Sequence, residues 1–128
     1  MKALLLVAHG SRREASNEEV RRLCERITNE DGKTFGLVEA AFLELAEPSI
    51  PEGIRQCVEA GADEVLVLPY FLSAGRHVSE DIPAIVETAR LEHPRIAIRL
   101  APYLGAADAV PDLIMRVANG GKDGDTGE

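Results

Sequence analysis

The sequence predicts an α/β protein built on a single four-stranded parallel sheet with helices on both faces. Short apolar runs alternate along the chain with longer segments whose apolar residues recur at helical spacing, which is the pattern of successive βαβ units. The length of 128 residues suits one domain. A content of 45% hydrophobic and 28% charged residues is an ordinary globular balance.

The first three elements are a strand, a helix and a second strand. Residues 4–8 form a continuous apolar run, as expected of a strand that is covered on both faces. Residues 14–29 carry an apolar stripe at i, i+3, i+4 spacing, which predicts a helix. Residues 36–45 are apolar but interrupted by Glu39 and Glu44, which predicts a second strand of lower burial.

The middle of the chain contains a second helix and a third strand. Ser49 and Glu52 form a capping box at the start of this helix. Gly61 is a typical left-handed terminator at its end. Residues 65–68 are again fully apolar and predict the third strand, which is followed by a long loop over residues 69–78.

The remaining elements are less regular. Ser79 is expected to cap a third helix, whose buried stripe would be Ile82, Ile85, Val86 and Ala89. Residues 96–100 alternate, which predicts a half-exposed edge strand, and a fourth helix carries Val110, Leu113, Ile114 and Val117. We therefore predict one domain over residues 1–119 and a disordered tail over residues 120–128, which are glycine-rich and polar.

Burial predicts the order of the strands. The first and third strands are the most apolar and should be central, whereas the second and fourth carry polar residues and should be edges. The order 2-1-3-4 follows, as in half of a flavodoxin-like fold. The topological switch point then lies between strands one and three, where open parallel sheets bind ligands at the carboxyl ends of their strands.

Charge and cysteine content exclude several classes of function. A formal net charge of -8 argues against nucleic acid or an acidic membrane surface as partner. No apolar run approaches the ~20 residues of a membrane span. Residues 1–8 resemble a short signal peptide, but no small-residue cleavage site follows, so we predict a cytoplasmic protein. Cys24 and Cys57 lie in helical apolar stripes and are expected to be buried.

Three side chains that can bind metals are predicted to meet at the switch point. His9 follows the first strand, His77 lies in the loop after the third, and Glu44 lies at the end of the second. Two imidazoles and a carboxylate suit a divalent ion such as iron, cobalt or nickel, and neutral imidazoles can also accept protons from a substrate. The alternative is that each histidine braces its own loop and that Glu44 is a solvated edge carboxylate.

The loop over residues 69–76 is unusually apolar for a surface connection. Such a surface beside polar ligands suits a flat apolar molecule, although it could instead pack on a helix or on a partner chain. Arg12, Arg13 and Arg76 lie close to the histidines in sequence and could pair with ligand carboxylates. The chain has no Walker loop and no G-x-G-x-x-G motif, so neither ATP nor a dinucleotide is supported.

Four stretches resemble the short-form sirohydrochlorin cobaltochelatases and the related sirohydrochlorin ferrochelatases. They extend over nearly the whole chain to about residue 119, and all four in this order form a specific signal. The stretches are Leu-Val-Ala-His9-Gly-Ser-Arg, Ala-Phe-Leu-Glu44-Leu-Ala-Glu-Pro-Ser-Ile, Gly-Ala-Asp-Glu-Val-Leu-Val-Leu-Pro69-Tyr-Phe-Leu and Gly75-Arg-His77-Val-Ser-Glu-Asp-Ile-Pro83.

This resemblance implies a class II chelatase fold that works without ATP or an organic cofactor. The family inserts a divalent metal, here Co²⁺ or else Fe²⁺ or Ni²⁺, into sirohydrochlorin on the way to cobalamin or sirohaem. Its two catalytic histidines map onto His9 and His77, and its metal-contacting glutamate maps onto Glu44. Full-length relatives carry two such domains with the active site between them, so the resemblance implies a homodimer that rebuilds the cleft.

The chemistry of metal insertion agrees with these residues. Two pyrrole N–H protons must be removed and the metal must lose water, which imidazoles and a carboxylate can bring about. Polar groups near His9 would bind the carboxylates of the substrate, and the apolar loop would lie against its ring. The predicted substrate-binding residues are Ser11, Arg12, Arg13, Tyr70, Phe71, Leu72, Ser73, Ala74, Gly75 and Arg76.

Two other functions fit parts of the sequence. The same fold could carry a metal or a tetrapyrrole without turnover, or act as a partner subunit, because one fold hosts many functions. Histidine phosphatases also place His-Gly after a first strand, but they have an arginine where this chain has Ala8.

Overall fold

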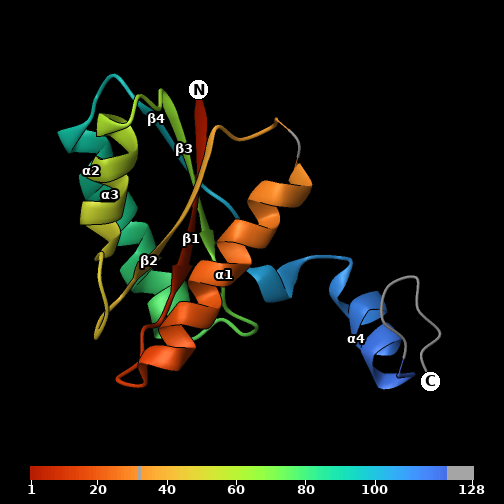
Figure 1. Cartoon of the computed structure of the whole chain (residues 1–128). Helices are drawn as coiled ribbons and strands as arrows, with labels where there is room; N and C mark the ends of the chain where they lie inside the picture. Colours follow the sequence, from red (N-terminus) through yellow and green to blue (C-terminus); the bar gives the residue numbers. More distant parts are fainter. Residues whose placement is uncertain (32, 121–128) are drawn as a thin grey trace.

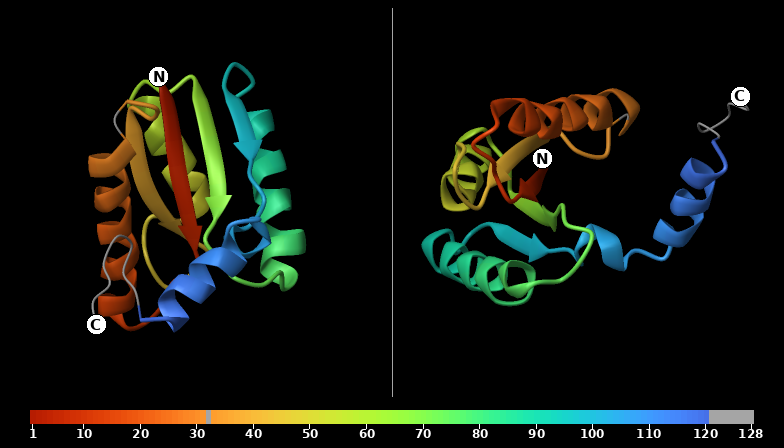
Figure 2. Two further views of the ribbon diagram at one scale, coloured as in Figure 1. Left: turned by 90° about the vertical axis from the view of Figure 1, so that its right-hand side faces the viewer. Right: turned by 90° about the horizontal axis from the view of Figure 1, so that it is seen from below.

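A computed structural model describes residues 1–31 and 33–120 of the chain. Its four parallel strands are β1 (Lys2–Ala8), β2 (Leu37–Phe42), β3 (Glu64–Pro69) and β4 (Ala97–Leu100), and they lie in the order β2-β1-β3-β4. This order confirms the prediction made from strand burial. All four strands run in the same direction, so their carboxyl ends share one edge of the sheet (Figure 2).

Helices cover both faces of the sheet, as predicted. Helix α1 (Glu14–Asp31) packs on one face, whereas α2 (Ile50–Glu59) and α3 (Ile82–Glu92) pack on the other (Figures 1 and 2). Strand β1 contributes alternate side chains to the two cores, because successive residues of a strand point to opposite faces. Leu4, Leu6 and Ala8 are buried under α1, and Ala3, Leu5 and Val7 are buried under α2 and α3.

Helix α2 begins after Ser49 and ends before Gly61 as predicted, but of the two capping-box hydrogen bonds the described residues show only the one that Ser49 accepts. The Ser49 hydroxyl accepts a hydrogen bond from the Glu52 amide at 3.3 Å. The Glu52 carboxylate accepts from the Nε of Arg55 at 3.2 Å. After the helix, Gly61 has a φ of 107°, the left-handed conformation that glycine adopts without steric cost.

The third helix begins earlier than the sequence predicts. A π-helical turn, η1 (His77–Asp81), leads directly into α3, so the expectation that Ser79 caps this helix is wrong. The amides of Val78 and Ser79 both donate to the Gly75 carbonyl, at 3.1 and 3.0 Å, and the Ser79 hydroxyl donates to the same oxygen at 3.1 Å. The chain therefore winds from Gly75 onward, and His77 lies on a helical turn rather than in a loop.

The fourth helix also departs from expectation. After the 3-10 turn η2 (Leu104–Ala106), α4 (Val110–Ala118) stands away from the sheet and covers neither face (Figures 1 and 2). Its apolar side chains Leu113, Ile114 and Val117 are 52%, 58% and 68% exposed. The apolar spacing predicts the helix correctly, but spacing does not determine what covers its apolar stripe.

Two sequence-based expectations concern the chain end and the membrane. The predicted tail over residues 120–128 lies outside the described residues, apart from Gly120. Among the helices of residues 1–31 and 33–120, none combines the length and the apolar character needed to cross a membrane.

Both cysteines are buried as predicted, and we expect them to be inert in the folded protein. Burial, with a smaller contribution from Glu39, raises the pKa of each thiol to about 11. A thiol-specific reagent at about pH 8 should label neither Cys24 nor Cys57 until denaturant unfolds the chain, because the thiolate is the reactive form. Fast labelling of the native protein would contradict this burial.

The same pKa shifts predict how stability depends on pH. Unfolded thiols regain an ordinary pKa near 9.0, so the unfolded state loses these protons first as pH rises. The free energy of unfolding should therefore fall between about pH 9 and 11. Urea unfolding of the wild type beside a Cys24→Ala/Cys57→Ala variant isolates this contribution. If the free energy of unfolding fell equally steeply with pH in the two proteins, the thiols would make no contribution to this pH dependence.

Candidate functional site

The candidate site lies at the carboxyl edge of the sheet, where parallel pairing continues beyond the ends of the strands. The Leu43 amide donates to the Ala8 carbonyl at 3.0 Å, and the Glu44 amide donates to the His9 carbonyl at 3.1 Å. On the other side of β1, the Tyr70 amide donates to Val7 at 2.7 Å. These bonds hold the segments after β1, β2 and β3 together at the predicted switch point.

His9 lies between the other two predicted site residues. Its Nε2 is 3.3 Å from Oε2 of Glu44. Its ring centroid is 5.1 Å from that of His77, with an interplanar angle of 63°. All three side chains are about half exposed, so they are open to a ligand. The structure thus brings together residues that are far apart in sequence.

Gly10 makes the contact between His9 and Glu44 possible. Its φ of 96° lies in the left-handed region, which residues with a Cβ rarely adopt. A Cβ placed on Gly10 would lie 1.7 Å from the carbonyl oxygen of Glu44. Only glycine allows the loop after β1 to approach the loop after β2 this closely.

The hydrogen bonds of His9 determine which of its nitrogens can bind a ligand. Its Nδ1 is 3.0 Å from the Gly10 carbonyl, which can only accept, so Nδ1 carries the hydrogen. In the neutral ring Nε2 then presents a lone pair toward the carboxylate of Glu44. The lone pairs of these two acceptors, 3.3 Å apart, repel each other, and a cation between them, either a proton or a metal ion, would remove that repulsion.

Asn17 is a positioning residue that the sequence analysis missed. It is 2% exposed, and its Oδ1 accepts from the Ser11 amide at 2.9 Å while its Nδ2 donates to the Ser11 carbonyl at 2.8 Å. The helix α1 thereby holds the loop that carries His9. A polar residue within the apolar stripe of a predicted helix is the signal that could have revealed it.

The predicted substrate-binding residues fall into two groups. Near His9, the Ser11 hydroxyl accepts from the Arg13 amide at 2.9 Å, and the side chains of Arg12 and Arg13 are exposed. In the loop after β3, Phe71 packs partly buried against the core under α2 and α3. Exposed residues of this loop are Tyr70, Leu72, Ser73, Ala74, Gly75 and Arg76.

The structure does not assemble the three predicted metal ligands into a closed site. Across residues 1–31 and 33–120, no group of three His, Cys, Asp or Glu side chains is placed to hold a metal ion. His9 contacts Glu44 and His77 separately, and Asp81 Oδ2 lies 2.8 Å from Nδ1 of His77. Their role as a ligand set stays a prediction.

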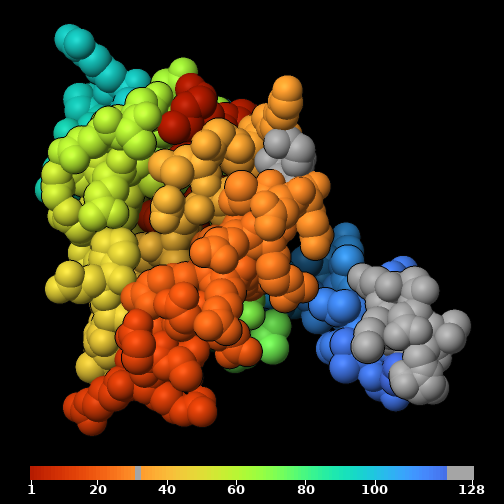
Figure 3. All heavy atoms as spheres, in the orientation of Figure 1, coloured from red at the N-terminus to blue at the C-terminus, as the bar shows by residue number. Residues whose placement is uncertain are grey.

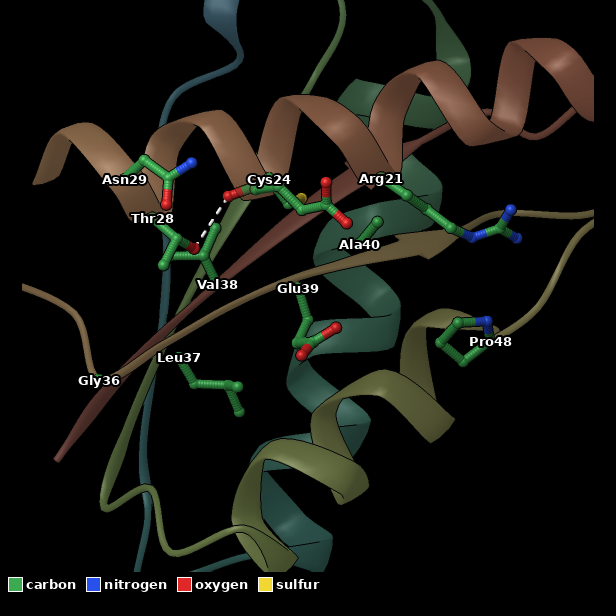
Figure 4. A pocket seen from close by; sticks show the side chains of 11 residues that line it. Arg21, Cys24, Thr28, Asn29, Gly36, Leu37, Val38, Glu39, Ala40 and Pro48 are labelled. Atoms are coloured by element: carbon green, nitrogen blue, oxygen red, sulfur yellow. Dashed lines mark hydrogen bonds between the residues drawn. The ribbon is translucent and has the colours of Figure 1, made fainter.

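A separate hollow lies along the outer edge of β2. It has a volume of about 510 Å³ and is lined by residues of α1 and β2 such as Cys24, Thr28 and Glu39 (Figure 4). None of the predicted site residues lines it. The hollow is therefore separate from the predicted switch-point site. One hydrogen bond at its wall runs from the Thr28 hydroxyl to the Cys24 carbonyl within α1.

Comparison with known proteins identifies the family. The CbiX family model matches residues 3–119. The chain belongs to the CbiX family. As a CbiX-family chain it shares its fold with SirB, the sirohydrochlorin chelatase of Bacillus subtilis subspecies spizizenii, solved in complex with cobalt. That match has a TM-score of 0.78 and 30% identity, and it covers 92% of this chain and 50% of SirB.

Two curated relatives of this CbiX-family chain are named for different metals, cobalt and iron. One is the sirohydrochlorin cobaltochelatase of Sulfolobus acidocaldarius, 41% identical over 92% of this chain and 90% of the relative. The other is the chloroplastic sirohydrochlorin ferrochelatase of Arabidopsis thaliana, 36% identical over 87% of this chain. The chain spans about half the length of this plant relative, 48%.

Substitution of Gly10 tests the close approach of the two loops. Gly10→Ala should lower the free energy of unfolding by about 1–3 kcal/mol or more, because it combines backbone strain with overlap on Glu44. It should also separate His9 from Glu44 and weaken Co²⁺ binding. Urea unfolding and Co²⁺ titration measure the two effects.

The matched control is Gly75→Ala. A Cβ at Gly75 meets nothing within 4 Å, so this variant should stay within about 0.5 kcal/mol of the wild type. If Gly10→Ala were as stable as Gly75→Ala, the two loops would not be in the contact described.

Proposed function

We propose that this chain is a sirohydrochlorin chelatase, which inserts a divalent metal into the tetrapyrrole without ATP. The observation that carries the proposal is the contact of His9 with both Glu44 and His77 at the switch point. Membership of the CbiX family, with relatives named as sirohydrochlorin chelatases, supports it. The cytoplasmic location stays a prediction.

The proposed reaction uses the two sides of this site differently. The incoming metal ion binds between Nε2 of His9 and the carboxylate of Glu44, which lie 3.3 Å apart. Imidazole and carboxylate ligands then replace water on the ion. As the ion leaves the two imidazoles and enters the ring, each freed imidazole can accept one of the two pyrrole protons. His77, with its ring beside that of His9, is the third proposed metal ligand.

The same edge provides groups for the rest of the substrate. Sirohydrochlorin carries several carboxylates, and the exposed side chains of Arg12 and Arg13 lie in the segment after His9. Arginine binds carboxylates through two parallel hydrogen bonds. Because the whole chain carries a net charge of -8, these arginines provide the local positive charge that a polyanionic substrate needs. The exposed apolar side chains of Tyr70 and Leu72 would lie against the ring.

Cobalt is the metal that we propose first, with iron or nickel as alternatives. The cobaltochelatase relative matches along nearly its whole length, whereas the ferrochelatase relative is matched over about half. Two imidazoles and a carboxylate can bind all three ions. The affinity of such a site follows the Irving–Williams order, which rises from Fe²⁺ through Co²⁺ to Ni²⁺.

We propose that the working form is a homodimer. The chain matches 50% of SirB, and two copies together would match the whole of its length. Helix α4 forms a lobe beside the body of the molecule (Figure 3), and apolar residues including Leu72, Leu113 and Ile114 line a hollow of about 480 Å³ there. An exposed apolar patch of this kind is typical of an interface, and Leu72 lies in the loop that leads into η1, the turn that carries His77.

Metal insertion followed by absorbance tests the proposed activity. With sirohydrochlorin and Co²⁺ the wild type should give many turnovers per chain, and His9→Ala and His77→Ala should each lower the rate at least about 100-fold, as loss of a proton acceptor does. His93→Ala is the matched control, because His93 ends α3 and lies outside the candidate site. Stoichiometric binding without turnover would contradict a chelatase and support a carrier.

Light scattering after size-exclusion chromatography tests the proposed dimer. The wild type should have the mass of two chains, and Ile114→Glu should have the mass of one, because a buried carboxylate opposes association. Leu91→Glu changes an apolar side chain on α3 that is also exposed, at 77% against 58% for Ile114, and should leave the dimer intact. A monomeric wild type would refute the proposal.

A further inference from the structure

The turn η1 places a carboxylate directly behind His77, and the proposed reaction does not yet use it. Asp81 Oδ2 lies 2.8 Å from Nδ1 of His77, a short hydrogen bond between side chains four residues apart. An ionised carboxylate only accepts, so Nδ1 carries the hydrogen. Nε2 of the neutral ring is then left with its lone pair free.

Both ends of this turn are held in place. At the start, the Gly75 carbonyl accepts from the amides of Val78 and Ser79. At the end, the Ile82 amide donates to the His77 carbonyl, and Ile82 is fully buried in the core under α2 and α3. Asp81 makes no hydrogen bond as a helix cap, so its carboxylate is available to His77. The geometry of the pair therefore depends on a fixed backbone.

The two histidines of the site then have the same arrangement of hydrogens. His9 donates from Nδ1 to the Gly10 carbonyl at 3.0 Å, and His77 donates from Nδ1 to Asp81. Each ring therefore keeps Nε2 as its free nitrogen, and the rings lie 5.1 Å apart. A histidine side chain in water favours the opposite tautomer, with hydrogen on Nε2, so each ring needs its acceptor to present the Nε2 lone pair.

We infer that Asp81 is a positioning residue that fixes His77 in the Nδ1–H tautomer and so keeps its Nε2 free for the metal or for a pyrrole proton. This inference rests on the proposed chelatase function for its effect on turnover, but not for the tautomer itself. Carboxylates behind metal-binding and catalytic histidines have this effect in other sites, where their loss typically costs 10–100-fold in affinity or activity.

The tautomer is measured first, on the full chain without metal. Nitrogen-15 chemical shifts of labelled histidine distinguish the two tautomers at about pH 8.5, two units above the ordinary imidazole pKa of about 6.5. His77→Gln assigns the signal. The wild type should show hydrogen on Nδ1 of His77, and Asp81→Ala should move it to Nε2. A wild type with hydrogen on Nε2, or an unchanged Asp81→Ala variant, would overturn the inference.

The matched control is Glu80→Ala, which removes a neighbouring acid from the same turn. Glu80 pairs with Arg76 at 3.9 Å, whereas His77 pairs with Asp81, so this variant should keep the wild-type tautomer. It reproduces the loss of one negative charge near the start of α3. A change of tautomer in Glu80→Ala as well would attribute the effect to charge alone and refute the role of Asp81.

Turnover is measured second, as cobalt insertion into sirohydrochlorin. Asp81→Ala should lower kcat about 10–100-fold and leave KM within about twofold, because Asp81 acts through His77 and not on the substrate. A kcat equal to that of Glu80→Ala would overturn the inference. If the wild type itself gave no turnover, the proposed function would fail, whereas the tautomer measurement would still decide the role of Asp81.

Discussion

The close approach of Gly10 to the backbone of Glu44 is the contact on which the candidate site depends. A left-handed glycine allows the loop after β1 to lie against the loop after β2. The resulting contact places Nε2 of His9 beside the Glu44 carboxylate. Under the proposed function, these two acceptors, held together by the backbone, would form a site for the metal ion before it arrives. Preorganisation of this kind reduces the cost of binding.

The rest of the molecule supports this contact from different directions. Buried Asn17 fixes the backbone of Ser11 from α1, and the amide of Tyr70 joins the chain after β3 to β1. His77 is held through buried Ile82, which anchors the start of α3. Each of these segments is thus attached to a packed element, while the side chains of His9, Glu44 and His77 stay half exposed. The apolar face of α4 is the one large feature of the described residues that packing within the chain does not explain.

The burial of the strands and the placement of the candidate site residues after them could be predicted from the sequence, because both depend on local residue types. The fully apolar first and third strands predicted the order β2-β1-β3-β4, and that order predicted the meeting of His9, Glu44 and His77. Asp81 was missed because His77 was expected in a loop, where a spacing of four residues has no structural meaning. The exposed stripe of α4 could not be predicted, because its apolar pattern is the same whether its own sheet or another chain covers it.

The measurement that tests this account most directly is a crystal structure of the chain with Co²⁺, using the anomalous scattering of cobalt to locate the ion. The account predicts a peak at bonding distance, about 2.0–2.2 Å for imidazole nitrogen and carboxylate oxygen, from Nε2 of His9 and from Glu44, with Nε2 of His77 as the further ligand. A cobalt ion bound through Nδ1 of either histidine, or bound away from His9 altogether, would contradict it.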